Sequence, residues 1–440
     1  MQTYFNELAE HVTAQLSGDE VATMSFAGED SDFVRFNQSK VRQAGSVSQR
    51  NLSLDLIAGR KHCEGSLTLA GDLEQDKPRV DALIRDLREK RAVLPEDPYL
   101  LYQTEPSNSE HVKRGELPAG EAAIGEIQSA GQGKDLVGIY AAGQIHTGFA
   151  SSLGQRNWHS SENYNFDWSF YHHGDKAVKT AYAGFTWDGA AFQRKVEEAT
   201  QKLAVLDKKP REVEPGEYRI YLSPSALYEI MGMLSWGGFG LKTHKTKQTP
   251  LIKMVESGAK LADGITLIEN TGEGVAPNFQ EQGFLRPDAV KLIEGGAYRD
   301  CLVSPRSAKE YGVETNGASR WETPDSLDLA AGSLANDKVL EELGTGVLVG
   351  NLWYLNWSDR TSCRTTGMTR FATFWVEDGE IQAPLNVMRF DETAYRVLGE
   401  NLVGLTADRE MILDAGSYFR RSTSSMRLPG ALVADFKFTL

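Results

Sequence analysis

The histidines of this chain are the first side chains to consider as metal ligands, because a catalytic zinc needs three protein ligands and one open position for water. The densest group comprises His159, His172, His173 and Asp175. If this segment forms strands, the adjacent His172 and His173 point to opposite faces and do not chelate one ion together. The pattern therefore favours polar strand residues near a turn over a metal site.

Cys363 is the next candidate for chemistry, as a nucleophile. Three arginines lie close to it in the sequence, namely Arg360, Arg364 and Arg370, and nearby positive charge favours a thiolate. A nucleophilic cysteine also needs a general base, and no histidine lies near in the sequence, although folding could bring one. The pattern favours a loop residue beside a substrate or partner over a nucleophile.

Other short motifs lack the residue spacing that a catalytic or nucleotide-binding site requires. His62-Cys63-Glu64 has the His-x-Glu form of zinc deaminases, but the sequence lacks the Pro-Cys-x-x-Cys that completes such a site. The glycine-rich runs at 237–243 and 344–346 match neither the phosphate loop nor the dinucleotide fingerprint, so we expect turns there.

The composition is that of a globular protein long enough for about two domains, with 440 residues. The 47 basic and 61 acidic residues give a net charge of −14, which argues against general nucleic-acid or anionic-membrane binding. Cys63, Cys301 and Cys363 are far apart and odd in number, so they predict reduced thiols. No signal peptide or membrane span is predicted, and we expect a cytoplasmic protein.

Hydrophobic periodicity predicts a first half of strands with flanking helices. The segments with helical spacing are 2–17, the stretch after Pro78, 119–129 and 192–203. Strands are expected over 21–69 and 136–187. Polar and aromatic residues alternate over 163–171, so one strand face would carry the aromatic row Tyr164, Phe166, Trp168 and Phe170. For this row, burial in the core is favoured over a subunit interface.

The charged segment 206–216, with two prolines and a glycine, is the best candidate for a linker. We therefore place the domain boundary there, with an N-terminal domain over 1–207 and a C-terminal domain over 208–440. The clearest hairpin of the second half runs from Arg370 to Leu385 around Asp378-Gly379, a pair that suits a tight turn with positive φ.

Five segments, in this order, resemble those of one known family. They are 150–154, 215–224, 284–296, 343–357 and the hairpin 371–385, which reads FATFWVEDGEIQAPL. On these residues the chain resembles the TldD/PmbA family of peptide-processing proteins, over most of its length and most strongly from Pro215 onward. Several matches in the correct order are more specific than any single motif.

The resemblance is to the subunit of that family without a zinc site. In the TldD subunit, the helix after the 215–224 run carries His-Glu-x-x-x-His, two zinc ligands and a general base, and a late cysteine is the third ligand. Here the helix reads SALYEIMGMLSW from Ser225 to Trp236, without histidine, and the late stretch 404–410 has no cysteine. The chain is thus similar to the PmbA (TldE) subunit. It also departs from the family's Gly-Asp-x-Ser over 358–369.

The resemblance implies an α+β fold, with a mixed N-terminal domain of antiparallel sheet and flanking helices and a C-terminal antiparallel, β-barrel-like domain with helices. It implies no catalytic residue and no metal in this chain. Zinc is expected in a partner, a TldD-like peptidase subunit that forms a heterodimer with the chain; a homodimer is the alternative assembly.

The implied substrates are unfolded or short peptides, including modified precursors in maturation, held by strand addition. The candidate peptide-side segment is next to the hairpin, with Asp359, Arg360, Cys363 and Arg370 as substrate-binding residues. Two alternative functions stay open. One is a stand-alone hydrolase that uses Cys363 or an unrecognised metal site, and the other is a regulatory binding module without a peptidase partner.

Overall fold

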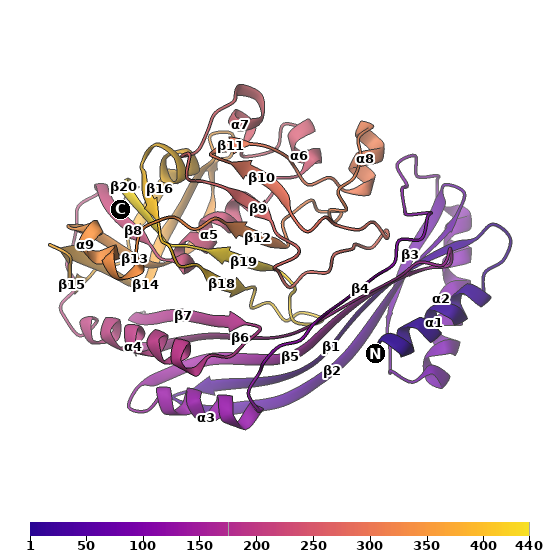
Figure 1. The fold of residues 1–440 in the computed structure, drawn as a ribbon, viewed down its shortest axis with the longest axis horizontal. Helices are drawn as coiled ribbons and strands as arrows, with labels where there is room; N and C mark the ends of the chain where they lie inside the picture. Colours follow the sequence, from indigo (N-terminus) through magenta and orange to yellow (C-terminus); the bar gives the residue numbers. More distant parts are fainter. Residues whose placement is uncertain (175, 440) are drawn as a thin grey trace.

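The computed structural model describes residues 1–174 and 176–439 (Figure 1). Its first half is built on a long, curved sheet of seven strands, in the order β3-β2-β1-β5-β6-β4 with β7 paired to β6. Neighbouring strands are antiparallel, except that β4 runs parallel to β6. The strands are β1 (Val21–Asn37), β2 (Lys40–Ala58), β3 (Lys61–Thr68), β4 (Ser109–Lys113), β5 (Asp135–Ser151), β6 (Arg156–His173) and β7 (Lys176–Gly184).

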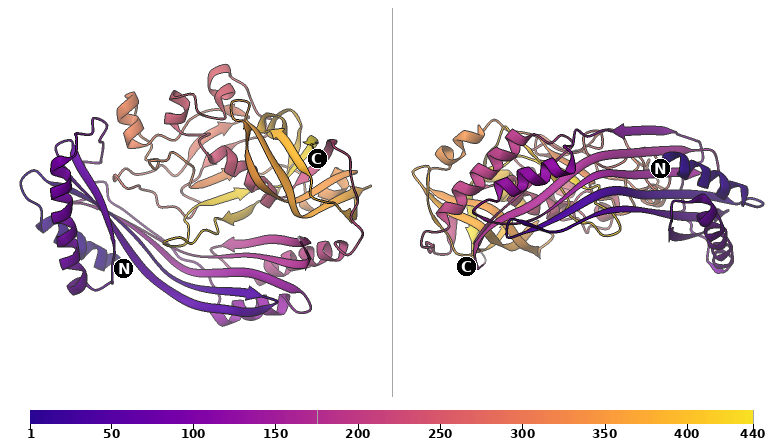
Figure 2. Two further views of the ribbon diagram at one scale, coloured as in Figure 1. Left: turned by 180° about the vertical axis from the view of Figure 1, so that it is seen from behind. Right: turned by 90° about the horizontal axis from the view of Figure 1, so that it is seen from below.

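Four helices cover this sheet, two at each end (Figure 2). They are α1 (Gln2–Ala14), α2 (Leu73–Val93), α3 (Gly120–Ala130) and α4 (Gly189–Val205). The buried positions of α1 follow helical spacing and pack with Phe26 and Trp158 of the sheet. Helix α2 begins before Pro78, because Asp72 caps it by accepting a hydrogen bond from the backbone N–H of Glu74 at 2.8 Å.

The second half contains a closed barrel of five strands, in the order β13-β8-β20-β16-β14, with β14 paired back to β13. Strand β15 extends β14, and β17 pairs with β20. The strands are β8 (Gly216–Leu222), β13 (Gly346–Asp359), β14 (Arg364–Glu377), β15 (Glu380–Pro384), β16 (Arg389–Thr393), β17 (Leu402–Leu405) and β20 (Ala431–Phe438).

A six-stranded sheet in the order β11-β10-β9-β12-β19-β18 completes the second half. Its strands are β9 (Leu267–Glu269), β10 (Val290–Glu294), β11 (Ala297–Tyr298), β12 (Ser326–Leu329), β18 (Glu410–Leu413) and β19 (Ser425–Leu428). Helix α5 (Pro224–Ser235) contacts β13 as well as β18 and β19, so it lies between the barrel and this sheet. The short helices are α6 (Leu241–Lys245), α7 (Ile252–Ser257), α8 (Pro305–Tyr311) and α9 (Val339–Leu343), with a 3-10 turn at Asn336–Lys338 and a π-helical turn at Arg396–Glu400.

The predicted fold class is confirmed, since antiparallel sheets with flanking helices precede a β-barrel with helices. The tight turn is confirmed too, because Asp378 and Gly379 join β14 to β15 with φ of 51° and 79°. The aromatic row of β6 is buried in a core with α3 and α4. The boundary between residues 207 and 208 falls between α4 and β8 and stays a prediction. None of the helices described is both long and apolar enough to cross a membrane.

Candidate functional site

Strand β6 presents two faces of opposite character, because successive residues of a strand point to opposite sides. The face opposite the aromatic row carries polar side chains that are buried too: Asn157, His159, Ser161, Asn163 and Asn165. The second half of the chain covers them. The Nε2 atom of His159 lies 3.0 Å from the carbonyl oxygen of Val275, and the Asn165 amide donates to the carbonyl oxygen of Leu413 at 3.4 Å. This polar face is therefore an interface between the two halves.

A segment of the second half, residues 414–424, crosses the polar face and joins β18 to β19; we call it the strap. It carries Tyr418 and Phe419, whose side chains are 92% and 84% exposed. The next two residues turn inward. Arg420 donates to the carbonyl oxygen of His146 at 2.8 Å and to Thr147 Oγ1 at 3.0 Å, and Arg421 is only 5% exposed. Two successive arginines thus fasten the strap to the sheet.

Neutral acceptors on three strands hold the guanidinium of Arg421. Its Nε donates to Ser31 Oγ at 3.0 Å, and its Nη1 donates to Oδ1 and the carbonyl oxygen of Asn163 at 2.8 and 3.2 Å. Its Nη2 donates to the carbonyl oxygen of Gly143 at 2.8 Å. Gly143 has a φ of 138°, and a backbone oxygen of β1 lies where a Cβ would be, so this close approach requires glycine.

A cavity of about 380 Å³ lies beside Arg421, between the strap and the sheet. Its charged lining residues are Arg35, Asp167, Lys179, Asp414 and Arg421. The amine of Lys179 lies 3.3 Å from the carboxylate of Asp167. Phe33, Ile139 and Phe371 supply apolar surface. A cavity of this size, with apolar walls and a few polar groups, is typical of a ligand site.

Helix α5 approaches the same region with Tyr228 and Glu229. Burial raises the pKa of Tyr228 to about 12, and the negative charges of Asp414, Glu229 and Asp167 add to this shift. Tyr228 and Glu229 are not among the described residues that line the cavity. Burial also raises the pKa of Glu229, and the positive charge of Lys179 opposes that shift.

Helix α5 contains no histidine and no cysteine, and Glu229 is its one carboxylate. Zinc in proteins takes histidine, thiolate and carboxylate ligands, and a catalytic site needs three of them. Across residues 1–174 and 176–439, no group of three or more His, Cys, Asp or Glu side chains could hold a metal ion. The residues present do not fit a catalytic zinc.

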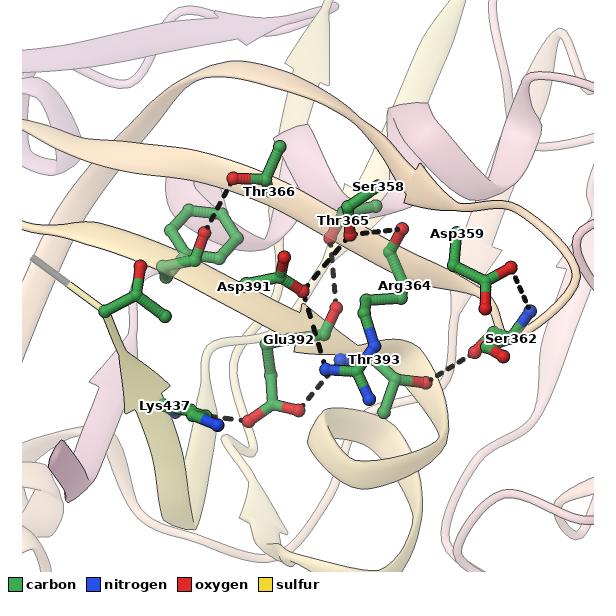
Figure 3. A network of polar contacts seen from close by, with 12 residues as sticks. Ser358, Asp359, Ser362, Arg364, Thr365, Thr366, Asp391, Glu392, Thr393 and Lys437 are labelled. Carbon is green, nitrogen blue, oxygen red and sulfur yellow. Dashed lines mark hydrogen bonds and ion pairs between the residues drawn. The ribbon is translucent and has the colours of Figure 1, made fainter.

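Two of the site residues predicted from the sequence meet at the tip of the β13–β14 hairpin (Figure 3). Asp359 accepts a hydrogen bond from the backbone N–H of Ser362 at 3.3 Å, and Arg360 donates to the carbonyl oxygen of Trp236 at 3.0 Å. Thr393 of β16 donates to the carbonyl oxygen of Ser362 at 2.9 Å and fixes the tip to the barrel. Asp359 and Arg360 are not among the described residues that line the cavity.

Cys363, the third predicted site residue, is buried in the core of the second half with 0% of its surface exposed. Burial raises the pKa of its thiol to about 12. The reactive species of cysteine is the thiolate, so a neutral thiol without solvent access is inert. The structure thus places Cys363 away from any surface that a substrate could reach.

Arg370, the fourth, packs on aromatic rings. Its guanidinium lies 4.1 Å from the ring centroid of Trp353 and 4.9 Å from that of Phe371. Tyr354 and Phe371 have φ of 59° and 58° at irregularities in the β13–β14 ladder. Phe371, the next residue in the chain, lines the cavity. Arg370 is therefore the predicted site residue that lies nearest to the cavity along the sequence.

The geometric argument about His172 and His173 is wrong, because a bulge after Tyr171 breaks the alternation of β6. The two rings lie 4.3 Å apart between centroids. His172 pairs with Asp207 at 3.1 Å, and His159 lies elsewhere, against Val275. Asp175, the fourth member of the predicted group, lies outside the described residues.

Arg421 and Asn163 are site residues that the sequence alone does not predict. The signal for Arg421 is a pair of adjacent arginines beside a serine-rich stretch, Ser422 to Ser425. Asn163 belongs to the alternation of β6, but that pattern does not tell which element covers the polar face.

Comparison with known proteins decides the family. The model of the PmbA/TldA metallopeptidase C-terminal domain matches residues 215–440, which is more than half of the chain. The chain belongs to the TldD/PmbA family. Metalloprotease PmbA of Escherichia coli O157:H7 is 29% identical over 133 residues, a stretch that covers 29% of this chain and 27% of that protein. The match thus spans about a quarter of the relative's length.

Solved structures share the fold over nearly the whole chain. TldE from Thermococcus kodakarensis has a TM-score of 0.77 at 15% identity, with 99% of this chain and 100% of that chain covered. A protein from Thermotoga maritima described as a modulator of DNA gyrase has a TM-score of 0.76 at 13% identity, with 99% and 100% covered. At such low identity these likenesses establish the fold alone.

Proposed function

We infer that the chain is the subunit without zinc in a TldD/TldE-type metallopeptidase complex. The observation that carries this proposal is helix α5, which contains no histidine and no cysteine to bind zinc. The partner is a TldD-like subunit that holds the zinc and forms a heterodimer with this chain. A homodimer of the chain is the alternative assembly.

The proposed substrate is an unfolded, short or modified peptide that the complex degrades or matures in the cytoplasm. Two features support a peptide. The cavity beside the strap combines apolar walls with groups that pair with a peptide backbone, and the polar face of β6 continues from it. Asp359, Arg360 and Arg370 on the β13–β14 hairpin stay our candidates for a second contact with the peptide.

The experiment is reconstitution with a zinc subunit from the same host. The chain, the zinc subunit and their mixture are each assayed for zinc content and for cleavage of an unfolded peptide. We expect the chain alone to bind no zinc and cleave nothing, and the mixture to form a stoichiometric complex that cleaves. Cleavage by the chain alone would refute the proposal, and loss of that cleavage in Cys363→Ser would establish the stand-alone hydrolase.

A second variant tests whether this chain contributes an acid–base group to the reaction. Glu229→Gln removes the one carboxylate of α5 and keeps the size of the side chain. In the proposed role this residue has no metal-bound water to activate, so the complex should cleave at the parent rate. A complex that loses its activity in this variant would show that the chain contributes chemistry to the reaction.

A further inference from the structure

We propose that the cavity beside the strap binds the free carboxylate at the end of a peptide, with Arg421 as its anion-binding group. The ligand class rests on the proposed function, since a peptidase complex supplies peptide termini. The site itself rests on the geometry of Arg421, on the charges around the cavity and on an unpaired amide oxygen.

Arg421 retains donor capacity for a ligand. A guanidinium has five N–H groups, and four hydrogen bonds of Arg421 are satisfied by Ser31, Asn163 and Gly143. All four acceptors are neutral. Within the described part of the chain, no carboxylate forms an ion pair with this guanidinium, although the buried Glu29 accepts a hydrogen bond from the backbone N–H of Arg421 at 2.8 Å and its negative charge acts on the guanidinium. The remaining N–H of the guanidinium is the donor that an anionic ligand would use.

The cavity is more positive than the protein around it. Arg35, Lys179 and Arg421 line it, against Asp167 and Asp414. Lys179 and Asp167 pair with each other at 3.3 Å, so among the lining residues the cations exceed the acids by one, and the charge of the buried Glu29 behind Arg421 offsets part of this excess. The whole chain has a net charge of −14. A local excess of positive charge in an acidic protein attracts anions to that place.

Asn165 supplies a second polar contact in the same cavity. Asn165 is 9% exposed, and its Oδ1 is buried without a hydrogen-bond partner among residues 1–174 and 176–439. Buried acceptors of this kind are rare in folded proteins unless a water or ligand completes them. An amide oxygen accepts the N–H of a peptide, while Phe33 and Phe371 offer apolar surface for the terminal side chain. The volume of about 380 Å³ suits a terminal residue and part of the next.

The experiment compares two probes on the complete purified chain by isothermal titration calorimetry. The probes are the tripeptide Ala-Ala-Phe with a free carboxylate and the same tripeptide with a C-terminal amide. We expect the acid to bind at least about tenfold tighter than the amide, since a hydrogen bond to a charged group is worth roughly 1.5–3 kcal/mol. The preference should shrink as salt is raised.

Variants then locate the site. Arg421→Lys keeps the positive charge but loses the planar fork, so the acid should bind several-fold more weakly. Arg194→Gln removes one exposed charge on α4 and should leave the binding unchanged. Asn165→Ala should weaken acid and amide alike, because it removes a contact to the peptide N–H. Circular dichroism spectra check that each variant is folded.

Equal binding of acid and amide, or binding of neither at millimolar concentration, would overturn the carboxylate site. The same holds if a tripeptide amide ending in glutamate binds as tightly as the acid, because a side chain would then be recognised instead of the terminus. These measurements need no partner subunit. If reconstitution with a zinc subunit fails but the chain binds the tripeptide acid more tightly than the amide, only the proposed complex is rejected. If the complex cleaves peptide but the chain binds acid and amide equally, only the carboxylate site is rejected.

Discussion

Replacing Arg421 with methionine should loosen the strap. Methionine keeps an unbranched side chain but is shorter and has no N–H, so Ser31 Oγ, two oxygens of Asn163 and the carbonyl oxygen of Gly143 each lose a donor. A buried acceptor without a partner costs about 1–3 kcal/mol. Water from the adjoining cavity reaches some of these oxygens, and the loss of a buried charge offsets part of the cost. We expect the free energy that holds the strap closed to fall by about 2 kcal/mol.

Proteolysis measures this loss directly. Tyr418 and Phe419 are exposed on the strap and are preferred sites of chymotrypsin, but cleavage needs a stretch of several residues to detach first. When opening and closing are fast compared with cleavage, the cleavage rate follows the population of the open strap. A fall of about 2 kcal/mol then means cleavage that is about 30-fold faster, since 1.4 kcal/mol is tenfold.

The control is Arg35→Met, which removes an exposed arginine at the same cavity. Surface substitutions of this kind change stability by about 0.5 kcal/mol or less, so the strap of this variant should be cut at close to the parent rate. If Arg421→Met were also cut at the parent rate, the four hydrogen bonds would not hold the strap, and the reasoning from buried acceptors would be wrong.

Three further predictions concern other parts of the chain. Cys363 should stay unlabelled by a thiol reagent in the folded protein while the half-buried Cys63 reacts, and labelling of both at one rate would contradict its burial. Burial, with the charge of Asp325 next, raises the pKa of Glu269 from 4.5 to about 7, so folding favours its neutral form. Its contribution to stability is present below pH 4.5 and is lost as pH rises through about 7. In urea unfolding, the free energy of unfolding of Glu269→Gln should lack this pH-dependent loss. If the free energy of unfolding depended on pH in the same way in parent and variant, the raised pKa of Glu269 would be contradicted. Alanine at both Arg360 and Arg370 should weaken peptide binding by the complex, whereas unchanged affinity would remove the hairpin from the proposed substrate site.

Much of the fold could be predicted from the sequence because its signals are local. The alternation over 163–171 gave strand β6 and its aromatic face, and Asp378-Gly379 gave the turn between β14 and β15. Helical spacing gave α1 and α4, although α2 begins at Leu73, before Pro78, because an aspartate cap outweighs the proline signal.

The candidate site could not be predicted in the same way, because it is assembled from distant segments. Arg421 meets Ser31 and Asn163 across about 390 and 258 positions of the sequence, and no periodicity connects them. Cys363 is predicted from the sequence to be a loop residue beside a substrate or partner, but it is buried in the core of the second half. Charged residues that are close in the sequence do not determine whether a thiol is accessible to solvent, because accessibility depends on the tertiary fold.

The buried polar face of β6 has a physical consequence for function. An apolar interface of the same area would hold the two halves together more strongly, because polar groups gain little net free energy from exchanging water for protein partners. A polar interface can instead open and rewet at modest cost, which gives a ligand access to the cavity without exposing apolar surface. The aromatic row on the opposite face packs into an apolar core. The sheet therefore has one buried face from which water is excluded and one polar buried face that can rewet beside the cavity.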